Sequence, residues 1–203
     1  MQLRPLLTAT LIVAMLTLSA CMSAEERAEG HYQSALTLLA AGDADRALVE
    51  LRNVFELDGF HKDARKLYAE TVLARGEVNE AYGQYLRLIE QYPDTPDVRL
   101  KLAELAITRG DWDEADRHGR EAIRLAPDMA GVPALRIALD YRKAVMARDT
   151  KQRQQVADAA GALLAGDPDN TLARRILIDY LVSGDTPLDA LPQIDQALKI
   201  EPD

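Results

Sequence analysis

The stretch Thr108–Asp128 reads TRGDWDEADRHGREAIRLAPD and separates a catalytic from a structural interpretation of the chain. It combines clustered carboxylates, a lone histidine and an Arg-Gly-Asp triplet, which suit an acidic catalytic site, a metal site or an adhesion loop equally well. A catalytic cluster usually occurs once in a domain, whereas a structural pattern can recur at a fixed interval. Recurrence elsewhere in the chain therefore favours the structural interpretation.

The pattern does recur, with a period of 34 residues. A glycine followed by an acidic residue, an alanine five residues after that glycine, and a chain-breaking residue between the units keep this interval over three copies, and two prolines continue it with one longer step. These repeat-structural positions are Gly42, Gly76, Gly110, Ala47, Ala81, Ala115, Gly59, Pro93, Pro127, Pro168 and Pro202. The acids of the opening stretch are therefore expected to cap and solvate helices.

Each period predicts two antiparallel helices. Leu100, Ala103 and Ile107 have helical spacing, and Gly110 supplies the left-handed residue that closes a helix. Asp111 follows as the N-cap of a second helix. Ala103 and Ala115 are expected where the two helices of a pair approach most closely.

These units resemble the tetratricopeptide repeat (TPR). The third copy carries Leu102-Ala103, Gly110-Asp111-Trp112-Asp113-Glu114-Ala115, Ala122-Ile123, Leu125 and Pro127 at the positions of the family pattern. The resemblance implies an all-α fold, a right-handed superhelix (α-solenoid) of about five helix-turn-helix repeats. The expected TPR domain spans residues 28–203, with repeats at about 28–61, 62–95, 96–129, 130–170 and 171–203.

Some residues depart from the family pattern. Arg65 and Arg99 occupy a usual Trp position, and Gly119 a usual aromatic position. The fourth unit carries seven extra residues around MARDTKQRQQ. The turn and close-contact residues keep the period in the first three units, and the fourth and fifth units are more divergent.

The first residues, MQLRPLLTATLIVAMLTLSAC, read as an export signal. Leu18-Ser19-Ala20-Cys21 resembles the lipobox of bacterial lipoproteins, so residues 1–20 are expected to be a lipoprotein signal peptide and residues 21–27 a tether lipidated at Cys21. An ordinary secretory signal ending at an incidental thiol is the alternative. Met22 favours the periplasmic face of the outer membrane over the inner membrane, since an Asp there would signal inner-membrane retention.

Composition and motifs argue against several classes of function. Acidic residues outnumber basic ones by 33 to 24, giving a net charge of −9, whereas nucleic-acid binding relies on clustered Lys and Arg. His31, His61 and His118 lack the short spacing of paired metal ligands on one helix. No phosphate-binding glycine loop or nucleophile elbow occurs in the sequence. We expect no catalytic residue, no metal and no cofactor.

In TPR proteins the first helix of each pair lines a concave groove, and its second, fifth, sixth and ninth positions usually meet ligands. The resemblance places this partner groove at Glu29, Tyr32, Gln33, Leu36, Asp63, Lys66, Leu67, Glu70, Asp97, Leu100, Lys101 and Glu104. Five acids against two lysines make the expected groove mildly acidic. The carboxylate clamp of some family members is missing, which argues against a chaperone-tail adaptor. Alternatively, these charges only keep an open face soluble.

The resemblance to envelope TPR lipoproteins implies a non-enzymatic scaffold for a protein or peptide partner. Such proteins act in outer-membrane protein assembly, pilus biogenesis, or exopolysaccharide and PEP-CTERM systems, and the sequence does not choose among these. The alternative is the N-terminal binding arm of a longer envelope enzyme or secretion protein. The apolar stripe Leu191, Ile194, Leu198 and Ile200 leads us to expect further repeats or a second subunit at the C-terminal edge.

Overall fold

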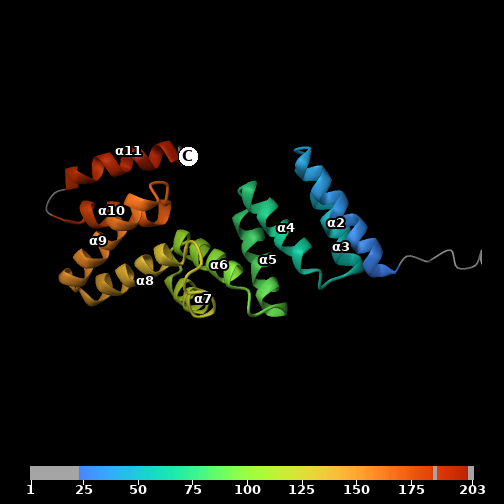
Figure 1. Ribbon diagram of the computed structural model, residues 1–203, viewed down its shortest axis with the longest axis horizontal. Coiled ribbons are helices and arrows are strands. Elements are labelled where there is room, and N and C mark those ends of the chain that lie inside the picture. Colours follow the sequence, from blue (N-terminus) through green and yellow to red (C-terminus); the bar gives the residue numbers. More distant parts are fainter. Residues whose placement is uncertain (1–22, 185–186, 201–203) are drawn as a thin grey trace, which may run out of the picture. The chain divides into compact units, whose positions relative to one another are not determined.

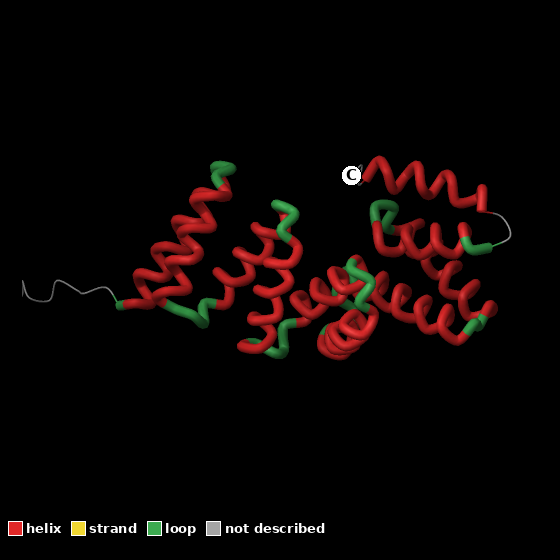
Figure 2. Tube along the Cα trace, turned by 180° about the vertical axis from the view of Figure 1, so that it is seen from behind, coloured by secondary structure: helices red, strands yellow, loops and turns green. Residues whose placement is uncertain are grey.

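The computed structural model describes residues 23–184 and 187–200, in which all regular structure is helical (Figures 1 and 2). Cys21 and Pro202 lie outside these ranges. The helices are α2 (Ala24–Ala40), α3 (Ala44–Leu57), α4 (Lys62–Ala74), α5 (Val78–Gln91), α6 (Pro96–Thr108), α7 (Trp112–Leu125), α8 (Val132–Ala147), α9 (Thr150–Gly166), α10 (Thr171–Val182), the 3-10 turn η1 (Pro187–Ala190) and α11 (Leu191–Ile200). None of them is long and apolar enough to cross a bilayer.

The chain divides into two compact units, one ending at Glu77 and the other beginning at Val78. The first unit contains α2, α3 and α4, and the second contains α5 to α11. The boundary falls between α4 and α5, the two helices expected to form the second repeat. Each unit is therefore described by itself.

The first helix starts earlier than the expected repeat boundary at residue 28. Ser23 and Glu26 form a capping box, in which the Ser23 hydroxyl accepts from the Glu26 backbone N–H at 3.0 Å and the Glu26 carboxylate accepts from the Ser23 N–H at 2.7 Å. These two bonds satisfy backbone donors that a helix start otherwise leaves open. Residues 24–27 of the expected tether are consequently helical.

The turns after α2, α4 and α6 share one backbone geometry. Gly42, Gly76 and Gly110 adopt φ of 78°, 79° and 77°, the left-handed region that glycine enters without a Cβ clash. In each turn the N–H of the next residue bonds a carbonyl five residues back at 2.9 Å, as Asp43 does to Leu38. This is the Schellman ending of a helix, which satisfies its last carbonyl groups.

An N-cap follows directly on this turn. The side chains of Asp43 and Asp111 accept from the backbone N–H groups of Arg46 and Glu114 at 3.1 and 3.3 Å. The two residues Gly-Asp thus end one helix and begin the next, which reverses the chain in very few residues.

The turn between α8 and α9 has the same form without a glycine. Arg148 takes the left-handed conformation, with φ of 55°, and is the one non-glycine residue of the described chain with positive φ. The N–H of Asp149 bonds the Ala144 carbonyl at 3.0 Å, and its carboxylate accepts from the Gln152 N–H at 2.9 Å. Arg148-Asp149 is therefore the counterpart of Gly110-Asp111.

The first unit is held by small and branched side chains between its helices. α3 contacts both α2 and α4. Ala47, Leu51 and Val54 of α3 are fully buried, and the Phe55 ring meets the edge of the Tyr68 ring at 5.7 Å between centroids. Burial of such side chains contributes about 1.5–3 kcal/mol for each large one, so this stripe carries much of the stability of the unit.

The second unit stacks antiparallel helices in chain order. α6 packs on α7, α7 on α8, α8 on α9, α9 on α10 and α10 on α11. One core cluster includes Ala103, Ala115, Ala122 and Leu135, all fully buried. The alanines allow α6 and α7 to approach closely, since a larger side chain there would have no space.

Gly119 allows α7 and α8 to approach closely, as the alanines do for α6 and α7. A Cβ built on Gly119 would lie 2.8 Å from the Leu139 Cδ1 atom and 3.4 Å from Leu135 Cδ2. The aromatic residue that the family pattern places here would collide with these leucines. The departure at Gly119 is thus explained by the packing of α8.

The extra residues of the fourth unit lengthen its helices. α8 has 16 residues and α9 has 17, against 13 in α6 and 14 in α7. The additional length lies at the α8–α9 turn, where Met146 is 67% exposed. The insertion therefore extends a helical hairpin instead of forming a loop.

Arginines near the start of α4, α6 and α10, two of them at the usual Trp position, tie each of these helices to the loop before it. The Arg65 Nη2 donates to the Gly59 carbonyl at 2.8 Å, and the Arg99 Nε donates to the Pro93 carbonyl at 3.3 Å. Arg174 makes the equivalent bond to the Pro168 carbonyl. In all three cases the acceptor lies six residues earlier, at the chain-breaking residue.

Candidate partner-binding surface

A surface formed by α2 and α4 gathers the candidate groove residues of the first unit. His61 is the N-cap of α4, and its Nδ1 accepts from the Ala64 backbone N–H at 3.2 Å. The other ring nitrogen, Nε2, lies 3.4 Å from a carboxylate oxygen of Glu29, so it carries the hydrogen and donates to it. The centroids of the Tyr32 and His61 rings lie 4.9 Å apart. His61 thus connects the start of α4 to the middle of α2.

Burial and nearby carboxylates shift the pKa of the Tyr32 hydroxyl. Partial burial raises the pKa of the Tyr32 hydroxyl, and the carboxylates of Asp63, Glu29 and Glu70 raise it further. The pKa of Glu29 is lowered, chiefly because the Gln33 amide donates to it at 2.8 Å. A half-buried aromatic side chain and three carboxylates that act on it therefore lie on this surface, which we call the Tyr32 surface (Glu29, Tyr32, Asp63, Glu70).

The remaining candidates of the first unit lie around it. Gln33 and Leu36 are exposed on α2, and Lys66 and Leu67 are half-buried on α4. The Lys66 Nζ lies 3.9 Å from Glu70, close enough to offset part of the negative charge. The surface is therefore acidic with one cation at its edge.

The third set of candidates lies on α6 in the second unit and is partly occupied by the fold itself. The Lys101 Nζ pairs with Glu104 at 2.6 Å, and Asp97 is half-buried. A Cβ on Gly131, the N-cap of α8, would lie 2.8 Å from the Leu100 Cδ2 atom. Leu100 therefore packs on the backbone that leads into α8. The family's groove positions could not predict this contact, because they are counted along one helix and ignore the helices that pack on it.

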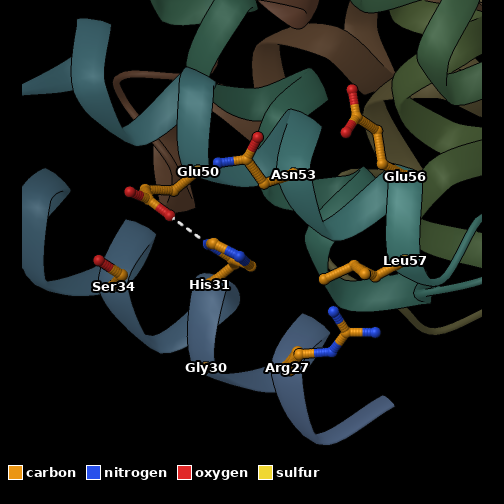
Figure 3. A pocket seen from close by; sticks show the side chains of 8 residues that line it. All are labelled: Arg27, Gly30, His31, Ser34, Glu50, Asn53, Glu56 and Leu57. Carbon is orange, nitrogen blue, oxygen red and sulfur yellow. Dashed lines mark hydrogen bonds and ion pairs between the residues drawn. The ribbon is translucent and has the colours of Figure 1, made fainter. Parts of the chain in front are cut away.

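Apart from the Tyr32 surface, the first unit has a hollow between α2 and α3 (Figure 3). It has a volume of about 530 Å³ and opens widely to solvent. The side chains around it are mostly polar: Arg27, His31 and Ser34 with Gly30 from α2, and Glu50, Asn53, Glu56 and Leu57 from α3. The His31 Nδ1 lies 2.6 Å from a Glu50 oxygen (Figure 3). Its mixed charges are those of a solvated face, and the sequence had singled out only His31 among them.

His118 is a structural residue of the second unit. It is fully buried, with Nδ1 3.3 Å from an Arg99 nitrogen and Nε2 3.2 Å from Glu114 Oε2. A neutral ring with hydrogen on Nε2 satisfies both contacts. Burial first, and then the Arg117 guanidinium, lower the pKa of His118 to about 4. Within residues 23–184 and 187–200 no three His, Cys, Asp or Glu side chains gather to hold a metal ion.

A family model described as "Tetratricopeptide repeat" matches residues 38–105, which include two of the glycine turns. The chain carries tetratricopeptide repeats. No curated protein matches the sequence of this TPR chain. The family assignment predicted from the 34-residue period is therefore confirmed.

Solved structures of TPR proteins share the fold. YrrB, described as "a TPR protein with an unusual peptide-binding site", is 16% identical with a TM-score of 0.58, over 85% of this chain and 86% of its own. MamA from Desulfovibrio magneticus RS-1 is 14% identical with a TM-score of 0.63, over 87% and 96%. PilF of Pseudomonas aeruginosa is 18% identical with a TM-score of 0.56, over 87% and 78%.

These likenesses confirm the prediction of an all-α solenoid fold. TPR proteins generally act as non-catalytic scaffolds that bind peptides or proteins. The Tyr32 surface can do this chemically: an aromatic ring and clustered carboxylates offer a contact area and acceptors for a basic or amide-rich segment.

Proposed function

We propose that this chain is a non-enzymatic scaffold of the bacterial envelope that captures a protein partner through the Tyr32 surface. The observation that carries the proposal is the contact of α2 with α4 at His61, whose ring lies 4.9 Å from the Tyr32 ring between centroids and 3.4 Å from a Glu29 oxygen. Asp63 and Glu70 are exposed, and Lys66 offsets part of the Glu70 charge at 3.9 Å, so both carboxylates stay accessible to a partner. A TPR structure of similar fold, YrrB, is described as having a peptide-binding site, which supports a peptide or an extended segment as the partner.

We further propose that the chain is held in the envelope by a lipid on Cys21. The support is the sequence Leu18-Ser19-Ala20-Cys21, which resembles a lipobox, and Met22 favours the periplasmic face of the outer membrane. Several acyl chains on one cysteine hold a protein firmly, because each buried CH₂ contributes about 0.8 kcal/mol. Assembly of outer-membrane proteins, pili or exopolysaccharide systems is the setting that such a lipoprotein suits.

The first experiment captures partners from envelope extracts with the anchored protein. Tyr32→Ala combined with Glu70→Lys should lower the yield of the captured protein at least tenfold while the helical circular dichroism stays unchanged. The matched control is Glu56→Lys, an exposed charge reversal at the hollow between α2 and α3. Equal capture by the wild type, the double variant and Glu56→Lys would refute partner binding at the Tyr32 surface. Loss of capture only with Glu56→Lys would show that the partner binds at the hollow between α2 and α3.

The second experiment follows lipidation. Cys21→Ser should abolish fatty-acid labelling and leave the precursor unprocessed by the lipoprotein signal peptidase. A mutant that is still labelled and still extracted only by detergent would show that the lipid is attached elsewhere or that the lipobox reading is wrong.

A further inference from the structure

The second unit contains a pocket that the sequence pattern did not predict. It has a volume of about 360 Å³ and lies where α8 and α10 meet the turn between α6 and α7. The pocket is the less open of the hollows described, and its size suits one large side chain with part of its backbone. Figure 1 shows α8 and α10 in the second unit, where they also contact each other directly.

The walls of the pocket are apolar. Ile107 and Trp112 flank the Gly110 turn on one side, and Ile176 and Val182 of α10 line another. Val182 is 53% exposed, so this apolar surface is open to a ligand. An aromatic or aliphatic side chain would gain about 25 cal/mol for each Å² of apolar surface removed from water. The interior therefore selects a large apolar group.

The rim of the pocket is cationic. The Arg142 guanidinium lies over the Trp112 ring, 5.2 Å from its centroid, and Arg175 is exposed beside it. Among the described residues no carboxylate forms an ion pair with either arginine. The one acid that lines the pocket is Asp179. Burial raises the pKa of the Tyr141 hydroxyl, and Asp179 raises it further. Two guanidinium groups against one carboxylate make a positive rim on a chain of net charge −9.

We propose that this pocket binds a large apolar side chain of a protein partner that is flanked by acidic residues. The apolar walls take the side chain, and Arg142 and Arg175 take the neighbouring carboxylates, because planar guanidinium groups bind carboxylates in pairs of hydrogen bonds. The inference rests on the proposed function as a protein-binding scaffold and names the chemistry of one recognised segment. That chemistry differs from the basic segment suited to the Tyr32 surface.

Trp112 makes the proposal directly measurable. It is the only tryptophan of the chain and forms part of the pocket wall. It also borders a neighbouring hollow at Asp116 and Lys143, so its fluorescence reports on these two sites and the variants of the rim tell them apart. The probe is a capped peptide, acetyl-Gly-Ser-Asp-Phe-Asp-Ser-Gly-amide, titrated into the full-length chain in mild detergent. We expect a saturable change in Trp112 emission, at least tenfold weaker affinity when Lys replaces both Asp residues, and no saturation when Ser replaces Phe.

Variants of the rim separate this pocket from general charge effects. Arg175→Glu should reverse the preference between the Asp and Lys peptides, whereas Arg136→Glu, an exposed residue of α8 that does not line the pocket, should leave it unchanged. Equal binding of both peptides, the same effect from both variants, or no saturable change up to millimolar peptide would overturn the proposal. Envelope capture that still depends on the Tyr32 surface would then leave the proposed function intact, and peptide binding without any such capture would refute the proposed function alone.

Discussion

Arg148 shows how strongly the turn geometry governs a single position. Its backbone takes the left-handed region that glycines take in the three earlier turns, and a side chain there costs about 1–2 kcal/mol. Replacement of Arg148 by glycine removes this strain. It also makes the unfolded chain more flexible, which destabilises the folded state by about 0.5–1 kcal/mol. The balance favours the folded state.

Arg148→Gly should therefore raise the free energy of unfolding by about 0.5–1 kcal/mol, measured by urea denaturation. The matched control is Arg136→Gly in the interior of α8, which should lower it by about 1 kcal/mol because glycine is a poor helix former. If Arg148→Gly lowered stability as much as the control, the left-handed conformation would not be a source of strain.

His118 predicts a dependence of stability on pH. Its pKa falls from 6.5 to about 4 in the fold, so the unfolded chain binds a proton at higher pH than the folded chain. The stabilising contribution is complete above pH 6.5 and is lost as the pH falls towards 4, by at most about 3 kcal/mol. An NMR titration of the His118 ring should show little protonation at pH 5.

Comparison with His118→Gln isolates this contribution from that of carboxylates such as Glu114. The loss of stability between pH 7.5 and pH 5 should be smaller in the variant. A ring that titrates near 6.5 in the native protein would contradict the prediction, whatever the variant does.

Among the helices, the close contact at Ala115 offers the clearest test of the packing. Ala115 is fully buried in the core cluster that contains Ala103. Ala115→Leu should lower the free energy of unfolding by about 1–3 kcal/mol, because three extra carbon atoms have no space there. Ala159→Leu on the exposed side of α9 should change it by less than about 0.5 kcal/mol. Equal melting temperatures of the two variants would argue against the close crossing.

The helix pairs could be predicted from the sequence because their turns depend on local chemistry. Gly110 and Asp111 mark a left-handed residue and an N-cap whatever surrounds them. Arg148 escaped prediction because an arginine gives no sign of positive φ, and the insertion moved it out of the 34-residue register. Arg65 could be noted only as a departure from the family pattern, since its bond to the Gly59 carbonyl depends on the path of the loop.

The candidate binding surfaces could be predicted from the sequence only in part. Two candidate residues of α2, Glu29 and Tyr32, do meet α4, where both lie next to the His61 ring. The pocket at Trp112 joins residues from α6, α7, α8 and α10, so no single helix carries its pattern. Contacts between successive pairs, such as Leu100 against Gly131, require the packed structure.

At the scale of the whole molecule, three of the four exposed leucines among the described residues lie in η1 and α11. Leu191 and Leu198 of α11 are 52% and 57% exposed, and Leu188 of η1 is 74% exposed. Ile194 and Ile200 are only half-buried, whereas the surface between α2 and α3 is mostly polar. Apolar side chains exposed together in this way favour association with another protein surface.

The purified protein should accordingly bind a hydrophobic dye and self-associate in light scattering. Leu191→Gln combined with Leu198→Gln should reduce both signals, while Leu36→Gln combined with Val49→Gln, two exposed residues of the first unit, should not. A wild-type protein that stays monomeric and dye-free would rule out this association.

The lengthened hairpin of α8 and α9 also carries a recognition surface away from the centre of the core. Three more residues in each helix displace its tip by about 4.5 Å along the helix axes relative to a pair of ordinary length. Val145, near this tip, is a wall of the Trp112 pocket, whereas the fully buried Leu135 lies two to three turns away. Val145 also packs against the edge of the core cluster, so an exchange at this tip can change the ligand preference of the chain where it keeps a side chain of similar size.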